Sequence, residues 1–527
     1  MRLPRRRVAP VDEDVAEVSP HFRNPFSHEL KLTLLQKVKI TVMTLTLFPV
    51  RLFFAAFMML LAWPFAFVAT VGRSDDAVEP LCWWRWLVDL VLKAIMRAMW
   101  FSGGFHWVRV KGRPALPSKA PILTLAPHSS YFDAIPVTMT MASIVMKAEN
   151  RDIPVWGTLI KFIRPVFVSR SDQDSRRKTV EEIKRRACSG GVWPQIMIFP
   201  EGTCTNRSCL ITFKPGAFIP AVPVQPVVLR YLNDMDTITW TWQGPGAFKI
   251  LWLTLCQLHN SMEIEYLPTY TPSEQERRNP ALFANNVRRV MAKALNVPIT
   301  DYSFEDCQLS MVQGPLRPPG NSCLLEFSRL LRLLGLKTGV TEEVLQDLAS
   351  RAQKLWGDRL GLEDFAQHLN LPVSEQLQDI FALFDDHSTG TVDLREYVIA
   401  LSVVHRPFKS LKTIKLAFTM FEEEDESITE EDLAAILRST LGVADLDVAE
   451  VFRVVDVTNK GKITFDQFRT LVEQSPDLVD QCLFRSGMSS PSCTEIPAPP
   501  ASSNGFCSDF SPHEQHCHGT AESKKLN

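Results

Sequence analysis

A histidine and an aspartate five residues apart offer the clearest chemistry in the chain. His128 and Asp133 flank two serines that suit the start of a helix, and the apolar run 121–125 predicts a buried strand just before them. A helix turns by about 100° per residue, so His128 and Asp133 would lie on different faces of one helix. The two side chains meet only if His128 lies in the turn between strand and helix.

An imidazole held in that turn can act as a general base. One ring nitrogen accepts a proton while the carboxylate of Asp133 holds the proton on the other nitrogen and fixes the tautomer. No serine or cysteine nucleophile is then required, because the deprotonated hydroxyl can belong to the substrate. A histidine near an aspartate is more often an ordinary surface pair, so this interpretation depends on residues further along the chain.

Polar side chains follow other strand-like runs downstream. Ligands of open α/β sheets bind at the carboxyl ends of the strands. An arginine there can grip a phosphate with two hydrogen bonds, and a glycine lets backbone amides approach an anion closely. The candidate residues for holding a phosphate-bearing substrate are Arg170, Glu201, Gly202, Thr203 and Lys214.

An α/β domain over residues 105–306 is expected to position these side chains. Strand-like and helix-like stretches alternate there, which indicates a largely buried sheet with covering helices. We expect strands at 107–110, 122–125, 166–168, 196–199 and 224–229, and a helix at 174–188.

Two apolar stretches precede that domain. After an N-terminal tail at 1–37, residues 38–72 are apolar enough to enter a bilayer core, although Pro49 and Arg51 interrupt them. This membrane segment either spans the bilayer or folds back as a re-entrant hairpin. Residues 81–101 predict an amphipathic helix whose tryptophans suit the membrane interface, or which packs on the following domain.

The chain changes character after about residue 321. Amphipathic helices separated by acidic loops over 321–473 are typical of an all-α EF-hand domain, and 385–396 follows the twelve-residue calcium loop. We expect one weak calcium site there, because position 3 is a histidine. A second loop, 456–467, has lost the acidic ligand at position 12. The candidate calcium ligands are Asp385, His387, Thr389, Thr391 and Glu396.

The C-terminal segment, 475–527, is rich in serine and proline and predicts a disordered tail. It ends in a lysine pair, Lys524 and Lys525, which resembles a retrieval signal of the endoplasmic reticulum. Such a signal implies dilysine-reading retrieval machinery as a partner. The eleven cysteines follow no disulfide or zinc pattern, and the net charge of −2 gives no sign of a nucleic-acid partner.

Four blocks of sequence, in order, resemble the glycerolipid acyltransferase family. The first is His128-x4-Asp133, and the second is Val-Phe-Val-Ser-Arg at 166–170, which departs from the family pattern in the Arg-Pro pair before it. The third is Phe-Pro-Glu-Gly-Thr at 199–203, and the fourth is Val-Pro-Val-Gln-Pro-Val at 222–227. The order and spacing of the blocks make the resemblance specific.

This resemblance implies acyl transfer from acyl-CoA to the free hydroxyl of a lysophospholipid, mainly the sn-2 hydroxyl of lysophosphatidylcholine. It also extends to acetyl transfer to lyso-platelet-activating factor and to acylation of lysophosphatidic acid or lysophosphatidylglycerol. His128 would be the base and Asp133 its orienting residue, while the phosphate-binding candidates would hold the acceptor. Acyl-CoA is then a co-substrate, no cofactor is needed for the chemistry, and calcium binds at one hand.

The resemblance further implies phospholipid remodelling and biosynthesis at the endoplasmic reticulum membrane, and also at the Golgi membrane and lipid droplets. The alternative is a calcium-responsive membrane adaptor built on a degenerate acyltransferase scaffold. The intact set of His128, Asp133, Arg170 and Glu201 favours the enzyme.

Overall fold

The computed structural model describes most of the chain between residues 24 and 475. Arg170, His387, Lys524 and Lys525 lie outside the described residues, as does most of the tail after 475. The described residues are 24–72, 83–153, 155–168, 173–312, 316, 318, 322–336, 340–355, 357–385, 389–422, 425–443, 446–457, 459–475 and 483.

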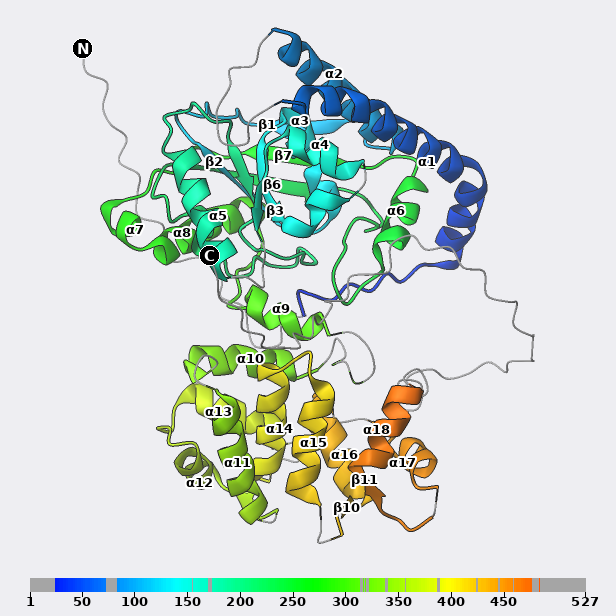
Figure 1. The fold of residues 1–527 in the computed structure, drawn as a ribbon, viewed down its shortest axis with the longest axis vertical. Helices are drawn as coiled ribbons and strands as arrows, with labels where there is room; N and C mark the ends of the chain where they lie inside the picture. Colours follow the sequence, from blue (N-terminus) through cyan, green and yellow to red (C-terminus); the bar gives the residue numbers. More distant parts are fainter. Residues whose placement is uncertain are drawn as a thin grey trace, which may run out of the picture. The chain divides into compact units, whose positions relative to one another are not determined.

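Within the described residues, seven strands form one sheet in the order β1-β7-β6-β2-β5-β3-β4. Figure 1 labels β1, β2, β3, β6 and β7 of this sheet. Neighbouring strands are parallel except for β6 and β7, which are antiparallel. The predicted α/β fold class is confirmed, and β3 and β7 are strands that we did not predict. The strands are β1 (Val108–Lys111), β2 (Ile122–Ala126), β3 (Ser143–Lys147), β4 (Val166–Val168), β5 (Ile196–Ile198), β6 (Val224–Tyr231) and β7 (Met262–Tyr266).

Helices cover both faces of this sheet. Because successive side chains of a strand point to opposite faces, Ile122 and Ala126 of β2 pack in one apolar cluster with α5 and α8, whereas Leu123 and Leu125 pack in another with α3 and α6. This two-sided burial explains why β2 is apolar almost throughout. The helices of this domain are α3 (Ile135–Thr140), α4 (Trp156–Phe162), α5 (Gln173–Ala187), α6 (Ala247–Leu255), α7 (Glu274–Arg278), α8 (Pro280–Leu295) and α9 (Phe304–Ser310), with 3-10 turns η1 (Tyr131–Ala134), η2 (Ala148–Asp152) and η3 (Pro215–Ala217).

The apolar segment before the domain forms one continuous helix, α1 (Leu34–Thr70), which contains both Pro49 and Pro64. The hairpin that we considered for this segment does not form. Each proline removes only one backbone hydrogen bond, and contacts with α2 (Trp83–Ser102), α4 and α6 support the helix along its length. Among the described residues, α1 is the one helix long and apolar enough to cross a membrane.

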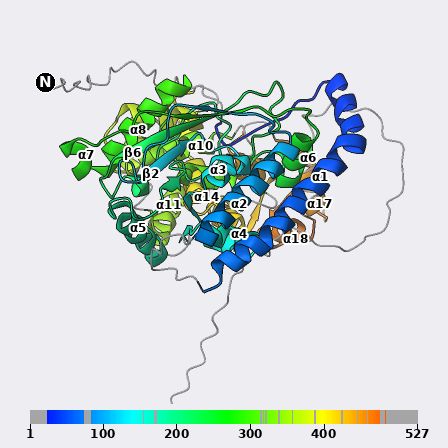
Figure 2. The same ribbon diagram turned by 90° about the horizontal axis from the view of Figure 1, so that it is seen from above.

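The carboxyl-terminal half of α1 lies against α2 (Figure 2). Small side chains of α1 (Ala62, Ala66 and Ala69) meet larger ones of α2 (Leu92, Met96 and Met99). The outer face of the two helices leaves large apolar side chains exposed. These include Val42, Leu45, Phe53, Phe57 and Leu60 of α1 and Trp83, Trp86, Leu87, Leu90 and Val91 of α2.

A buried arginine ties α1 to the α/β domain. Arg51 is 7% exposed, and its guanidinium donates to the carbonyls of Leu255 (3.1 Å), Leu258 (2.9 Å) and Gln257. The Leu255 carbonyl belongs to the last residue of α6, where backbone acceptors lack partners within the helix, and the other two carbonyls lie in the segment that follows. Arg51, whose charge interrupts the apolar segment, therefore caps the end of the neighbouring helix α6.

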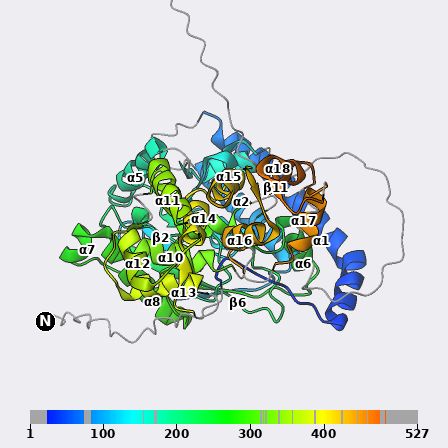
Figure 3. The same cartoon turned by 90° about the horizontal axis from the view of Figure 1, so that it is seen from below.

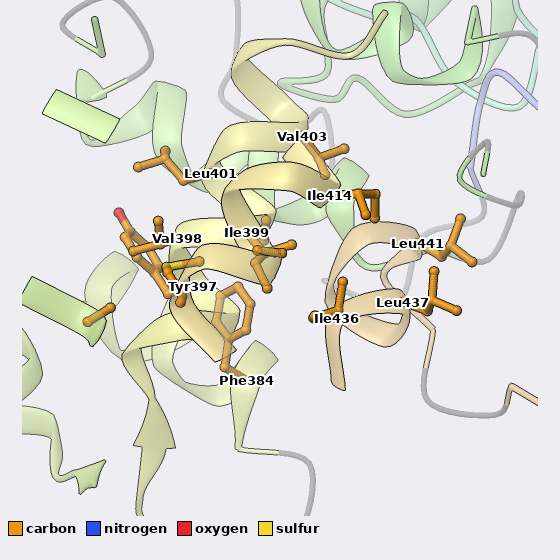
Figure 4. Close-up of a cluster of buried hydrophobic side chains, with 14 of the residues drawn as sticks. Phe384, Tyr397, Val398, Ile399, Leu401, Val403, Ile414, Ile436, Leu437 and Leu441 are labelled. Carbon is orange, nitrogen blue, oxygen red and sulfur yellow. The ribbon is translucent and has the colours of Figure 1, made fainter. Parts of the chain in front are cut away.

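The C-terminal part of the chain is the predicted all-α domain, with two short antiparallel strand pairs that join neighbouring hands: β8 (Arg359–Leu360) with β9 (Val392–Asp393), and β10 (Ser427–Ile428) with β11 (Ile463–Thr464). Figure 3 shows its helices from below, and Figure 4 shows part of its core, where Tyr397 and Phe384 pack with rings 5.9 Å apart. The helices are α10 (Leu324–Leu333), α11 (Glu342–Lys354), α12 (Leu362–His368), α13 (Glu375–Phe384), α14 (Leu394–His405), α15 (Ser410–Phe421), α16 (Glu430–Leu441), α17 (Ala449–Val455) and α18 (Phe465–Gln474).

The substitution Arg51→Met tests the attachment of α1. It keeps most of the side-chain volume but leaves the carbonyl acceptors at the end of α6 unsatisfied, so we expect a loss of roughly 2–4 kcal/mol in the free energy of unfolding. Thermal unfolding of the detergent-solubilised protein measures this loss. Lys39→Met, at an exposed position of the same helix, is the matched control. Equal unfolding midpoints for the two variants would contradict the capping role.

Candidate active site

His128 lies in the turn between β2 and η1. The peptide bond between Ala126 and Pro127 is cis, and β2 ends there. Ser130 caps the following 3-10 turn, since its hydroxyl accepts from the N–H of Phe132 at 3.3 Å. This is the geometry that the His128 and Asp133 pair requires, with the histidine before the helical turn and the aspartate within it.

The carboxylate of Asp133 is the centre of the site. Its Oδ2 lies 2.9 Å from His128 Nδ1 and accepts from the N–H groups of Ser129 (2.7 Å) and Ser130 (3.0 Å). Its Oδ1 accepts from the hydroxyl of Tyr231 at 2.6 Å. Because a carboxylate can only accept a hydrogen bond, His128 Nδ1 must carry a proton and donate it to Asp133. His128 Nε2 is then left as a proton acceptor.

The Nε2 side of His128 faces a thiol. Cys204 Sγ lies 3.6 Å from Nε2, and the imidazole stacks on the ring of Phe199 with centroids 4.3 Å apart. The His128 side chain is 24% exposed, so a substrate can reach it. Burial lowers the pKa of His128, but the interactions with Cys204 and the hydrogen bond to Asp133 together raise it well above its ordinary value.

Glu201 lies beneath the histidine and supports its backbone. Its Oε2 accepts from the N–H of His128 at 2.8 Å, while the N–H of Thr205 donates to the His128 carbonyl at 2.8 Å. Burial raises the pKa of Glu201 to about 8, against the opposing effect of the His128 N–H. Because Glu201 is fully buried, this geometry favours a positioning role over the contact with the acceptor that we expected.

Gly202 and Lys214 lie together on the loop after β5. Gly202 has a φ of +71°, a backbone conformation that favours glycine, and a Cβ at this position would come within 3.1 Å of the flexible Lys214 side chain. Lys214 is 41% exposed, and its Nζ lies over the ring of Phe304 at 3.7 Å. Thr203 is buried, with its hydroxyl 3.4 Å from Cys307 Sγ. Gly202 and Lys214 are therefore partly accessible, whereas Thr203 supports the loop from inside.

Two residues of the site were not predicted from the sequence, Cys204 and Tyr231. Tyr231 is the last residue of β6, and the guanidinium of Arg207 lies 5.2 Å above its ring. Arg207 in turn pairs with Asp236 at 2.7 Å. The only sequence signal for Tyr231 was its place just after the predicted strand 224–229, and Cys204 directly follows the third block, 199–203, without belonging to it.

In both calcium-type loops, groups at ligand positions already make hydrogen bonds within the protein. Asp385 accepts from the N–H groups of Thr389 (2.8 Å) and Gly390 (2.9 Å), and Arg359 donates to the carbonyl of Thr391 at 2.8 Å, at position 7 of the loop. In the second loop, Gln467 caps its own helix by accepting from the Thr464 N–H at 2.8 Å. Among the described residues no cluster of three or more His, Cys, Asp or Glu side chains is arranged to hold a metal.

Comparison with known proteins agrees with both domains. Residues 107–230 match the Acyltransferase family model, and residues 424–475 match the model of an EF-hand domain pair. These matches confirm the two domain types, although they do not assign roles to individual residues.

Full-length relatives are similar over nearly the whole chain. Lysophosphatidylcholine acyltransferase 1 of Danio rerio is 73% identical over 516 residues, which cover 97% of this chain and 98% of that protein. The protein of the same name from Homo sapiens is 62% identical, with 98% and 96% covered. Lysophosphatidylcholine acyltransferase 2 of Danio rerio is 44% identical, with 90% of each chain covered. The chain therefore belongs to the lysophosphatidylcholine acyltransferase family, and it is an acyltransferase.

Proposed function

We propose that the protein transfers an acyl group from acyl-CoA to the free hydroxyl of lysophosphatidylcholine, mainly at sn-2, and so makes phosphatidylcholine. The observation that carries this proposal is His128, whose Nδ1 is held by Asp133 while its side chain stays 24% exposed. The names of the full-length relatives support the choice of acceptor.

The reaction needs one base and no bound cofactor. His128 Nε2 takes the proton from the acceptor hydroxyl as its oxygen attacks the thioester carbonyl of acyl-CoA. Asp133 keeps the proton on Nδ1 and stabilises the imidazolium that forms. When the tetrahedral intermediate collapses, the C–S bond breaks and the sulfur of CoA leaves with the proton from Nε2.

The glycerophosphate part of the acceptor is assigned to Arg170, Gly202 and Lys214. Lys214 offers an ammonium group beside the close backbone approach at Gly202, which suits a phosphate. Glu201 and Thr203 hold the loop from beneath. A headgroup that protrudes from this loop would be weakly selected, so lysophosphatidic acid and lysophosphatidylglycerol are proposed as further acceptors. Lyso-platelet-activating factor, which carries the same choline headgroup, is proposed as an acceptor of acetyl from acetyl-CoA.

The membrane anchor is proposed to lie along one side of the bilayer. α1 has 37 residues and so is about 55 Å long, longer than the ~30 Å hydrocarbon core. It also contacts the domain both at Arg51 and near its carboxyl end. A helix held in this way presents its exposed apolar face to one leaflet and keeps the domain on the side where acyl-CoA is supplied.

The compartments in this proposal are the endoplasmic reticulum membrane, the Golgi membrane and lipid droplets. Lys524 and Lys525 serve there as a retrieval signal that cytosolic machinery reads. Calcium is proposed to bind weakly at 385–396, because the Arg359 guanidinium already satisfies an oxygen that calcium would use.

The first test is the transfer of labelled acyl-CoA to a panel of lysophospholipids by membranes that contain the wild-type chain or His128→Ala. We expect transfer to lysophosphatidylcholine to fall by about 10²–10⁴-fold in the variant, since the base is lost. A variant that is membrane-bound and folded yet retains wild-type transfer would reject the base. With calcium bound only weakly, a calcium chelator should leave the wild-type rate unchanged.

The second test concerns the side of the membrane. Protease added to sealed microsomes should cleave the domain at 321–473, because the anchor lies along one leaflet and leaves that domain outside. Detergent-permeabilised microsomes give the control digestion. If the domain is protected in sealed microsomes but cleaved after permeabilisation, α1 crosses the bilayer instead.

The third test uses the pH dependence of kcat/KM. The active form has Nε2 unprotonated, so the rate rises with pH through the raised pKa of His128 and its acidic limb lies above the ordinary imidazole value of about 6.5. Tyr231→Phe removes a hydrogen bond from Asp133 Oδ1, which leaves more negative charge facing His128. We expect the acidic limb to move to still higher pH and kcat/KM near neutral pH to fall roughly 3- to 10-fold.

The matched control for Tyr231→Phe is Tyr266→Phe, which removes a hydroxyl from the adjacent strand β7. The donors that reach Asp133 are His128, Ser129, Ser130 and Tyr231, so loss of the Tyr266 hydroxyl should leave the limb in place. A limb that shifts equally in both variants would show that Tyr231 acts through the sheet as a whole.

A further inference from the structure

Cys204 occupies a position that general-base catalysis does not require. It is partly exposed and lies beside His128, whereas Cys209, Cys256 and Cys307 are buried in apolar clusters. Thiols packed in an apolar core fill space and are unreactive, whereas a partly exposed thiol beside a base can react. The chemistry available to Cys204 therefore differs from that of these other cysteines.

The geometry around Cys204 is that of an activated nucleophile. Its sulfur lies 3.6 Å from His128 Nε2, and His128 Nδ1 lies 2.9 Å from Asp133 Oδ2. A nucleophile next to a base that a third group orients is the arrangement of covalent acyl transfer. A thiol also gives up its proton far more readily than an alcohol does, so the base that serves a lipid hydroxyl can serve this sulfur more easily.

We propose that Cys204 takes the acyl group from acyl-CoA when no lysophospholipid occupies the site, and that water then releases it, which makes the protein a slow acyl-CoA hydrolase. This second activity rests on the proposed function only in that both need acyl-CoA to bind beside His128. A bound acceptor hydroxyl displaces the thiol from Nε2, and transfer to the lipid then replaces the hydrolytic route.

The two steps balance without any further reactant. In the first, His128 Nε2 takes the proton of the Cys204 thiol, the sulfur attacks the thioester carbonyl, and CoA leaves with that proton. One thioester replaces another. In the second, Nε2 takes a proton from water, the hydroxide attacks the carbonyl of acyl-Cys204, and the Cys204 sulfur leaves with the proton as the free fatty acid forms. The partial exposure of His128 and Cys204 gives water a path to this bond.

The experiment incubates the purified full-length chain in detergent micelles with radiolabelled palmitoyl-CoA and no lysophospholipid. We expect label on the protein that neutral hydroxylamine removes, peptide mass spectrometry that places it on Cys204, and release of labelled palmitate. Cys204→Ala should lose the protein label and at least 10-fold of the palmitate release. Cys188→Ala, at an exposed cysteine outside the site, should keep both.

Cys204→Ser is a second variant that separates loss of the nucleophile from loss of the fold. An acyl group on this serine would form an oxygen ester, which resists neutral hydroxylamine, whereas a thioester on Cys204 does not. Acyl transfer to lysophosphatidylcholine by Cys204→Ala, at a rate well above that of His128→Ala, shows that the variant is folded. The proposal is overturned if the label or the palmitate release is the same in Cys204→Ala as in the wild type. A wild-type chain that acylates lysophosphatidylcholine but shows neither label nor hydrolysis also overturns it and leaves the proposed function standing.

Discussion

The buried carboxylate of Asp133 is the interaction on which the site depends. A carboxylate with a side chain only 1% exposed is costly unless its oxygens are satisfied, and here four donors reach it. Two of these donors are backbone N–H groups of the turn itself, so the same contacts that stabilise the charge also shape the turn that holds His128. Tyr231 supplies the fourth donor from the end of β6, which fixes the turn to the centre of the sheet.

Support for His128 also comes from the other side. Glu201 accepts from the histidine N–H and Thr205 donates to its carbonyl, so the loop after β5 holds both polar backbone groups of the residue. Neighbouring parallel strands β2 and β5 bring these two loops to one edge of the sheet. Glu201 of the third sequence block therefore positions His128 of the first block by binding its backbone, in addition to any contact with substrate.

Local sequence patterns predicted much of this structure. The features that they missed depend on contacts between residues far apart in the chain. The His128 and Asp133 pair could be read because its members lie in one turn, and the buried strands could be read from their apolar runs. Strand β7 was missed because Glu263 and Glu265 make it look polar; both carboxylates pair with Arg230 on the neighbouring strand. Cys204 and Tyr231 lie 76 and 98 positions from their partners in the site, and no spacing rule connects residues so far apart.

The proposed position of α1 along one leaflet bears on the kind of lipid surface that the protein can use. A helix that must cross a bilayer needs water on both sides, and a particle coated by a single layer of phospholipid has oil on its inner side. In the proposed arrangement α1 lies along its own domain, where its Arg51 caps α6 and its small side chains pack on α2, and such a helix needs only the outer layer. We therefore propose that the same anchor can rest on a flat bilayer or on the monolayer of an oil droplet without refolding.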